Sequence, residues 1–384
     1  MGVRFTACAA CGAAVLVAAI LGLAAPAYPH KPITTSIIFK NEIAQIFQRK
    51  CFQCHTENNL GVPLTSYTDA RPWARAIREE VLERRMPPWS AVRGYGRFSN
   101  DLSLSAREME VILSWADGGA PSGVPKAEEP LPPVFVAPAP SWDRGEPDVA
   151  VPIGSGQAIA AGAPFEIKRF VVPTGFTAAR RVRALALKQG DRRVVRHAAF
   201  YEETSGRWLG GWTPWQTAAE LPKGVVHQLP AGARIVVEIG YSGAEEAVTD
   251  KSELGFYFDQ GAASPTSSLA LTATQVAVAP GSTGQRVRTE TTLTSDIGAL
   301  AFWPNPGRGA RSVEITATTP DGLTTPLLWI KDYRGDWQSP YVMSNALTLA
   351  RGTRLAMTSY YDNAGDQPVA ARLQAWLLTA APKR

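Results

Sequence analysis

The sequence predicts a multidomain protein in which a small all-α domain is followed by an all-β region of tandem antiparallel sandwiches, jelly-roll-like in type. Apolar residues recur at spacings of three and four between residues 37 and 117, and apolar and polar residues alternate after residue 148. A proline-rich stretch separates the two patterns. The chain has 384 residues, enough for two to four domains. Because 45% of them are hydrophobic, real cores can form, and global disorder is excluded.

The first 27 residues have the features of a secretory signal peptide. Arg4 supplies a short positive region, residues 13–25 are small and apolar, and Ala25-Pro26-Ala27 offers a cleavage site. The apolar stretch is too short for a bilayer core of about 30 Å. We therefore expect residues 1–27 to be removed and the mature chain to be periplasmic or otherwise exported, with an uncleaved membrane anchor as the alternative. No later stretch reaches 18 apolar residues, so the mature chain is expected to have no transmembrane segment.

The helical pattern lies in residues 28–120, which we expect to form the small all-α domain. Asn41 is a predicted N-cap, and Pro72 occupies a predicted first helical position. Ser105 and Glu108 form a capping box before a third apolar face, which ends at two glycines followed by a proline. The pattern therefore predicts three helices.

The rest of the chain is predicted to be a linker followed by strands. Residues 121–147 contain eight prolines and few periodic apolar residues, which is typical of a semi-rigid linker. After it, short alternating runs are separated by turn residues, and no long helical stretch interrupts them. We expect one sandwich over residues 148–263 and a second over residues 264–384.

The motif with the most specific chemistry is Cys51-Phe52-Gln53-Cys54-His55, which has the C-x-x-C-H spacing of covalent haem attachment. Cysteines three residues apart on a helical turn present both sulfurs to one side, where they can bond the two haem vinyl groups. The following histidine can then ligate the iron. A redox dithiol and half of a zinc site are the alternatives, but no other cysteine or nearby histidine completes a zinc set. We therefore expect one covalent haem c.

The sixth iron ligand is predicted to be Met86. It lies just after a predicted helix and before two prolines, which stiffen the loop and can hold a thioether toward iron. Met109 lies on the apolar face of the last predicted helix, where a methionine usually fills a core. An open, five-coordinate iron with Met86 as a packing residue is the alternative.

Residues 39–119 resemble the single-haem cytochrome c domains of exported bacterial multidomain proteins. The resemblance implies Met86 as axial ligand. It rests on Cys51-Phe52-Gln53-Cys54-His55, Met86-Pro87-Pro88-Trp89, Leu104-Ser105 and Trp115-Ala116-Asp117-Gly118-Gly119-Ala120.

Most of residues 142–370 resembles the two-sandwich core of the copper type II, ascorbate-dependent monooxygenases, the peptidylglycine and dopamine hydroxylating enzymes. Some bacterial members of that group carry such an N-terminal cytochrome. The resemblance rests on the order of six short segments: Gly145-Glu146-Pro147-Asp148-Val149, Val195-Arg196-His197, Leu229-Pro230-Ala231-Gly232, Gly255-Phe256-Tyr257-Phe258, Asp336-Trp337-Gln338 and Tyr361-Asp362-Asn363.

The copper ligands of that group are largely missing from this chain. Its His-His pair corresponds to Arg196-His197, and its His-x-His corresponds to Gly240-Tyr241-Ser242. The distant methionine has no clear counterpart near Gln374-Ala375-Trp376. A residual copper site would have only His197 and His227, whereas copper in imidazole sites needs several nitrogens. We expect no bound copper and a degenerate, non-catalytic scaffold.

These observations predict an exported c-type cytochrome that transfers single electrons and is not an enzyme. Its β region would dock a redox partner protein or structure a multiprotein complex. A net charge of +5 without a dense Lys/Arg block argues against a nucleic-acid partner. An active copper-dependent monooxygenase with its own haem electron donor is the first alternative. A haem-based sensor or assembly protein is the second.

Overall fold

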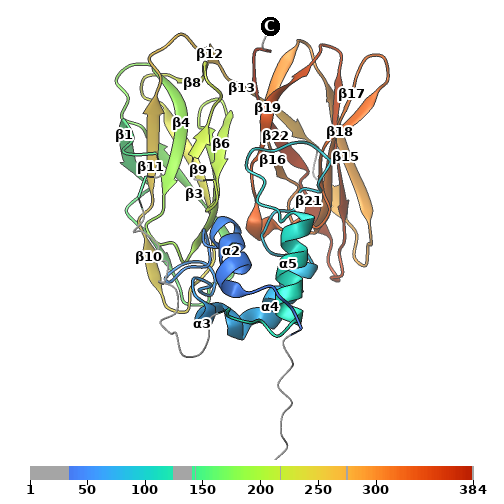
Figure 1. Cartoon of the computed structure of the whole chain (residues 1–384). Helices are drawn as coiled ribbons and strands as arrows, with labels where there is room; N and C mark the ends of the chain where they lie inside the picture. Colours follow the sequence, from blue (N-terminus) through green and yellow to red (C-terminus); the bar gives the residue numbers. More distant parts are fainter. Residues whose placement is uncertain (1–33, 124–140, 143, 217, 274–275, 383–384) are drawn as a thin grey trace, which may run out of the picture.

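The computed structural model describes residues 34–123, 141–142, 144–216, 218–273 and 276–382. The predicted signal peptide and residues 124–140 of the predicted linker lie outside these ranges. Two groups of β-sheets stand side by side, and the helices lie on one side of them, toward the lower part in Figure 1. No helix among the described residues is long and apolar enough to cross a membrane.

The helices are short, and those that pack together all lie between residues 39 and 117. Phe39, Phe47 and Trp115 meet at the centre of their apolar cluster, with ring centroids 6.1–6.3 Å apart. The elements are η1, a π-helical turn (Phe39–Ile43), α2 (Ala44–Lys50), α3 (Tyr67–Ala70), η2 (Arg71–Trp73), α4 (Ala74–Leu82) and α5 (Ala106–Asp117).

The predicted helix boundaries are partly confirmed. Ser105 and Glu108 form the predicted capping box of α5, and Pro72 lies in the first turn of η2. The predicted N-cap at Asn41 is wrong. The chain turns helical at Phe39, because the π-helical turn η1 precedes α2, so Asn41 lies inside the helix.

The first sandwich consists of two main sheets that share one apolar core. One sheet has the order β1-β11-β4-β8-β12, with β7 on β4, and the other has the order β3-β9-β5-β6. Every pair is antiparallel except β12 with β8. The strands are β1 (Val149–Pro152), β2 (Gln157–Ile159), β3 (Glu166–Pro173), β4 (Arg180–Lys188), β5 (Val195–Glu202), β6 (Trp208–Trp212), β7 (Ala218–Glu220), β8 (Val225–Leu229), β9 (Arg234–Tyr241), β10 (Val248–Asp250), β11 (Glu253–Phe258) and β12 (Ser264–Pro265).

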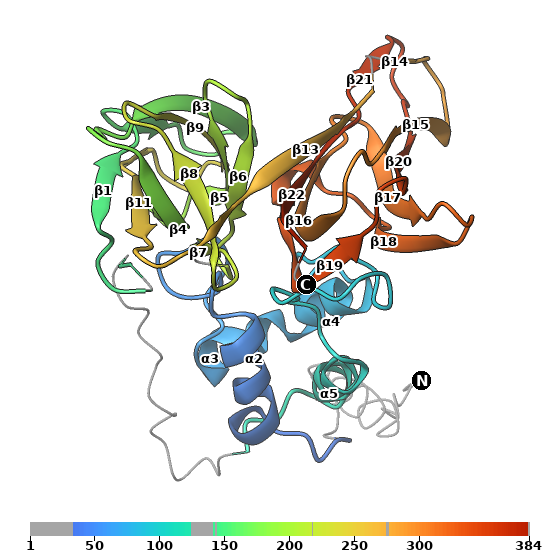
Figure 2. The same cartoon turned by 90° about the horizontal axis from the view of Figure 1, so that it is seen from above.

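The second sandwich has sheets of order β13-β22-β16-β19 and β15-β20-β17-β18, and β14 pairs with β21. Its core takes residues from both main sheets. Figure 2 shows β13 crossing from the first sandwich to the second. The strands are β13 (Ser267–Thr272), β14 (Val276–Val278), β15 (Gln285–Thr292), β16 (Ile297–Asn305), β17 (Ala310–Thr318), β18 (Thr324–Ile330), β19 (Tyr341–Leu349), β20 (Arg354–Tyr361), β21 (Val369–Ala371) and β22 (Gln374–Ala380). The predicted all-β antiparallel sandwich region is thus confirmed.

One part of the segment predicted to be helical belongs to the second sandwich. Residues 89–102, here called the anchor segment, run between α4 and α5 and contain no helix. The segment covers the edges of both sheets, through a bridge from Ala91 to Ile330 and another from Phe98 to Met343. Trp89 and Leu102 are buried in the core of the second sandwich. The anchor segment therefore joins the chain between α4 and α5 to the core of the second sandwich.

Candidate haem-binding site

The structure brings the four predicted haem residues to one cavity. Cys51, Cys54, His55 and Met86 all line a cavity of about 220 Å³. The first three follow α2, and Met86 follows α4. The α-helices therefore place the two halves of the predicted site against each other.

The C-x-x-C-H motif continues the helical turn at the end of α2. The Cys51 amide donates to the Phe47 carbonyl at 2.8 Å, and the His55 amide donates to the Cys51 carbonyl at 2.9 Å. Both cysteines are free thiols. Burial raises the pKa of Cys51 and of Cys54 to about 12. The two thiols are therefore neutral, unpaired and turned to the same cavity.

The His55 ring is fixed by its neighbours. Its Nδ1 lies 2.9 Å from the Val62 carbonyl oxygen, and a hydrogen bond there leaves Nε2 as the nitrogen able to ligate a metal. Burial lowers the pKa of His55, and the bond to Val62 opposes this shift. Gly61 lies against the ring, since a Cβ there would be 2.5 Å from Cε1 of His55. Glycine is thus the residue that allows this ring position.

Met86 is held by the end of α4 and by the prolines after it. The amides of Arg85 and Met86 both donate to the Glu80 carbonyl, at 2.9 and 3.2 Å. The Arg85 guanidinium also pairs with the Glu80 carboxylate at 2.8 Å. Met109 is not among the residues lining the 220 Å³ cavity. It lines a neighbouring cavity of about 1140 Å³, which also reaches Met86.

The rest of the cavity is mostly apolar and includes one residue that sequence reasoning did not assign to it. Trp337, from the short helix η3 (Gly335–Trp337) of the second sandwich, is 8% exposed and lines the cavity. It lies far from the motif in the chain, so no local pattern could place it there. The other apolar lining residues include Phe47, Leu60, Leu64, Val81, Leu102 and Ile112. An apolar cavity with two free thiols, an imidazole and a thioether fits the donor set of a haem c.

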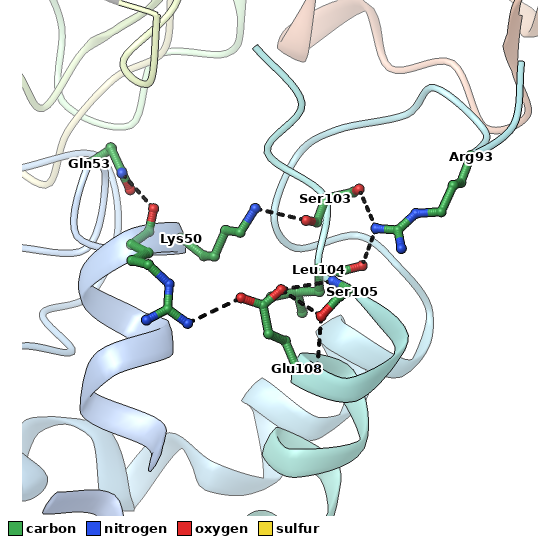
Figure 3. A network of polar contacts seen from close by, with 8 residues as sticks. Lys50, Gln53, Arg93, Ser103, Leu104, Ser105 and Glu108 are labelled. Atoms are coloured by element: carbon green, nitrogen blue, oxygen red, sulfur yellow. Dashed lines mark hydrogen bonds and ion pairs between the residues drawn. The ribbon is translucent and has the colours of Figure 1, made fainter. Parts of the chain in front are cut away.

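A polar network closes one edge of this region, as Figure 3 shows. Lys50 Nζ donates to the Ser103 carbonyl at 2.9 Å, and the Arg49 guanidinium pairs with Glu108 at 3.3 Å. Arg93 donates to Ser103 Oγ at 3.2 Å and to the Leu104 carbonyl at 3.0 Å. The network ties the end of α2 to the start of α5 and to the anchor segment.

His197 and His227, the histidines that a residual copper site would use, lie on different sheets. His197 is on β5, and its ring packs beside Phe165 and Trp303, with centroids 5.7 and 6.0 Å away. His227 is on β8, with Nδ1 2.8 Å from Thr266 Oγ1. Burial lowers the pKa of both imidazoles to about 3. Within the described ranges, no three His, Cys, Asp or Glu side chains are grouped to hold a metal ion directly.

No family model and no curated protein matches the chain. Among solved structures it is similar to PNGF-II, with 12% identity, 62% of this chain and 66% of that chain covered, and a TM-score of 0.27. It is also similar to the A223 turret protein of Sulfolobus turreted icosahedral virus, with 9% identity, 59% and 98% covered, and a TM-score of 0.17. An allantoicase from Saccharomyces cerevisiae has 11% identity, 59% and 83% covered, and a TM-score of 0.19. At these TM-scores the similarities carry no argument.

Proposed function

We propose that this chain is an exported c-type cytochrome that carries one covalent haem and passes single electrons to a partner protein. Cys51 and Cys54 would form the thioether bonds, and His55 and Met86 would ligate the iron. The observation that carries the proposal is the single apolar cavity lined by all four side chains. Residues 28–120, after the signal peptide, would be the cytochrome c domain.

A haem bound there would supply reversible one-electron chemistry at its iron. The chain's own residues orient the ligands and exclude water. The bond from His55 to Val62 orients the imidazole, and the turn after α4 directs Met86 to the cavity. The apolar lining keeps water away, and a thioether ligand raises the reduction potential relative to a second imidazole.

The β region is proposed to be a degenerate scaffold of the copper-monooxygenase type, of jelly-roll-like sandwiches, which docks the partner or structures a complex. An Arg guanidinium stays protonated and cannot donate a lone pair to copper, and Gly240 offers no side chain. The sandwich cores are built from alternating apolar residues, so they do not depend on a metal. We expect neither bound copper nor hydroxylation.

The electron-transfer role is tested by redox titration of protein purified from cells that mature c-type cytochromes. We expect the ratio of oxidised to reduced haem, measured from the visible spectrum, to change tenfold for every 59 mV of ambient potential, as for the transfer of one electron. The haem should stay with the polypeptide on acid–acetone extraction. The matched control is Cys51→Ser with Cys54→Ser, which should release whatever haem it binds. Extractable haem in the unmodified protein, or two haems per chain, would overturn the proposal.

The loss of copper chemistry is tested separately on the same preparation. We expect no stoichiometric copper after dialysis, and no hydroxylation of a glycine-extended peptide with ascorbate and oxygen. Retained copper together with hydroxylation would favour the monooxygenase alternative. Haem with an open sixth position that binds carbon monoxide without displacing Met86 would favour the sensor alternative.

A further inference from the structure

A charged pair from the two sandwiches lies beside the haem-binding cavity. Arg196 is at the start of β5 in the first sandwich, and Asp336 is in η3 of the second. Their side chains approach to 3.6 Å between Nη1 and Oδ2. The Arg196 guanidinium also lies over the Trp337 ring, with Cζ 4.7 Å from its centroid. Because Trp337 lines the cavity, the pair is one side chain away from it.

The backbone conformation at Arg196 directs its side chain toward Asp336 and Trp337. The pairing of β5 with β9 shifts register between Val195 and His197, so Arg196 lies at a β-bulge. A bulge redirects the side chain of the extra residue away from the regular alternation. Asp336 is also held by Arg334, whose Nη2 lies 3.0 Å from the same Oδ2 atom. Both charges are therefore positioned by their own sandwich.

The charge of Arg196 is only partly compensated, because Arg196 shares Asp336 with Arg334. The side chains of Arg196 and Asp336 are 24% and 30% exposed, and Arg196 Nε is buried without a hydrogen-bond partner in the described part of the chain. Charges that are shielded from water act over longer distances than surface charges.

Reduction of haem iron adds one electron from a donor and neutralises one positive charge, with no bond formed or broken. A nearby cation therefore favours the reduced form, and a nearby anion favours the oxidised form. We propose that Arg196 and Asp336 set the reduction potential of the haem, acting in opposite directions from the two sandwiches. This inference rests on the proposed function and deepens it, because it makes the β region part of the redox centre.

The test is a redox titration of the full-length haem protein and its variants at one fixed ambient potential. Arg196→Gln should raise the oxidised-to-reduced ratio at least threefold, which corresponds to about 28 mV at 59 mV per tenfold. Asp336→Asn should lower the ratio by a similar factor. Arg196→Lys, which keeps the charge, should stay close to the unmodified protein, and the double variant Arg196→Gln with Asp336→Asn should lie between the single variants.

The matched control is Arg207→Gln. Arg207 is another partly buried arginine of the first sandwich, and it donates to the Thr266 and Gln228 carbonyls at 3.0 and 2.9 Å. Gln228 belongs to β8 and Thr266 follows β12, and these strands lie toward the end away from the helices (Figure 1). The control should leave the ratio unchanged.

The proposal is overturned if Arg196→Gln and Asp336→Asn change the ratio no more than the control, or if both change it in the same direction. If Arg196→Gln does not fold, the titration of Asp336→Asn alone decides the proposal. A merely structural effect of Asp336→Asn would loosen the cavity, admit water and raise the oxidised-to-reduced ratio, whereas loss of the negative charge lowers that ratio. Absence of covalent haem from the unmodified protein would instead be the failure of the proposed function. The two failures are therefore distinguishable before any variant is titrated.

Discussion

The position of the His55 ring depends on the absence of a side chain at Gly61. A Cβ at Gly61 would lie 2.5 Å from Cε1 and 2.6 Å from Nδ1 of His55, so Gly61→Ala must displace the imidazole. We expect a destabilisation of about 1–3 kcal/mol and loss of the six-coordinate haem spectrum. Urea unfolding and the visible spectrum check this. Gly298→Ala is the control, because a Cβ there meets its nearest atoms at an ordinary 3.5 Å. Equal spectra for both variants would contradict the prediction.

The ligand assignment predicts opposite effects on the haem spectrum for substitutions of Met86 and Met109. Met86→Ala should abolish the sulfur-to-iron charge-transfer band at the red end of the visible spectrum and lower the reduction potential. Met109→Ala should keep the band, because Met109 is outside the cavity lined by the cysteines. The ligand assignment is wrong if the band disappears in Met109→Ala and survives in Met86→Ala.

The burial of His227 predicts that folding stability depends on pH, independently of any bound haem. Burial, and secondarily the charge of Arg207, lowers its pKa to about 3, whereas the unfolded chain protonates near 6.5. Below pH 6.5 the unfolded state therefore binds a proton that the folded state does not, so stability falls as pH falls from 6.5 toward 3. Between pH 7 and pH 5 this one histidine should remove about 2 kcal/mol. His227→Gln should lose less stability over that interval in urea unfolding, and an unchanged difference would contradict the assignment.

At the scale of elements, the anchor segment is tied down by Asn100. Its Nδ2 donates to Gln216 Oε1 at 2.6 Å and to the Pro340 carbonyl at 2.7 Å, and its Oδ1 accepts from the Val342 amide at 3.1 Å. One side chain thus joins the anchor segment to both sandwiches. Asn100→Ala leaves those partly buried partners unpaired and should cost about 1–3 kcal/mol in thermal or urea unfolding. The exposed Asn345→Ala should change stability by less than about 0.5 kcal/mol, and equal losses would contradict the role of Asn100.

The elements also divide into those that sequence could and could not predict. The capping box of α5 and the strands of the β region follow from local spacing, and both are confirmed. The anchor segment has no periodic pattern, so nothing local indicates that Trp89 and Leu102 enter the core of the second sandwich. Trp337 is absent from the predicted site for the same reason, since only the tertiary fold brings η3 to the cavity. The haem ligands Cys51, Cys54, His55 and Met86 stay a prediction from residue type and spacing, and the structure shows only that these side chains line one cavity.

At the scale of the whole molecule, the cavity is assembled from parts that are distant in the chain. The segments after α2 and α4 contribute the cysteines, His55 and Met86, and the second sandwich contributes Trp337. The first sandwich places Arg196 against that tryptophan. A redox group in this cavity would therefore respond to how the two sandwiches sit against each other. A partner that docks on the β region and shifts the two sandwiches would then change the reduction potential of a haem in this cavity.

The central claim is that this cavity holds one haem bound through Cys51 and Cys54. Intact-mass spectrometry under denaturing conditions tests it most directly, because only a covalent haem survives denaturation. Protein matured in the periplasm should have the mass of the processed chain plus one haem, and the Cys51→Ser, Cys54→Ser variant should have the mass of the processed polypeptide alone. A mass without haem for the unmodified protein, or the same added mass on the double variant, would contradict the account.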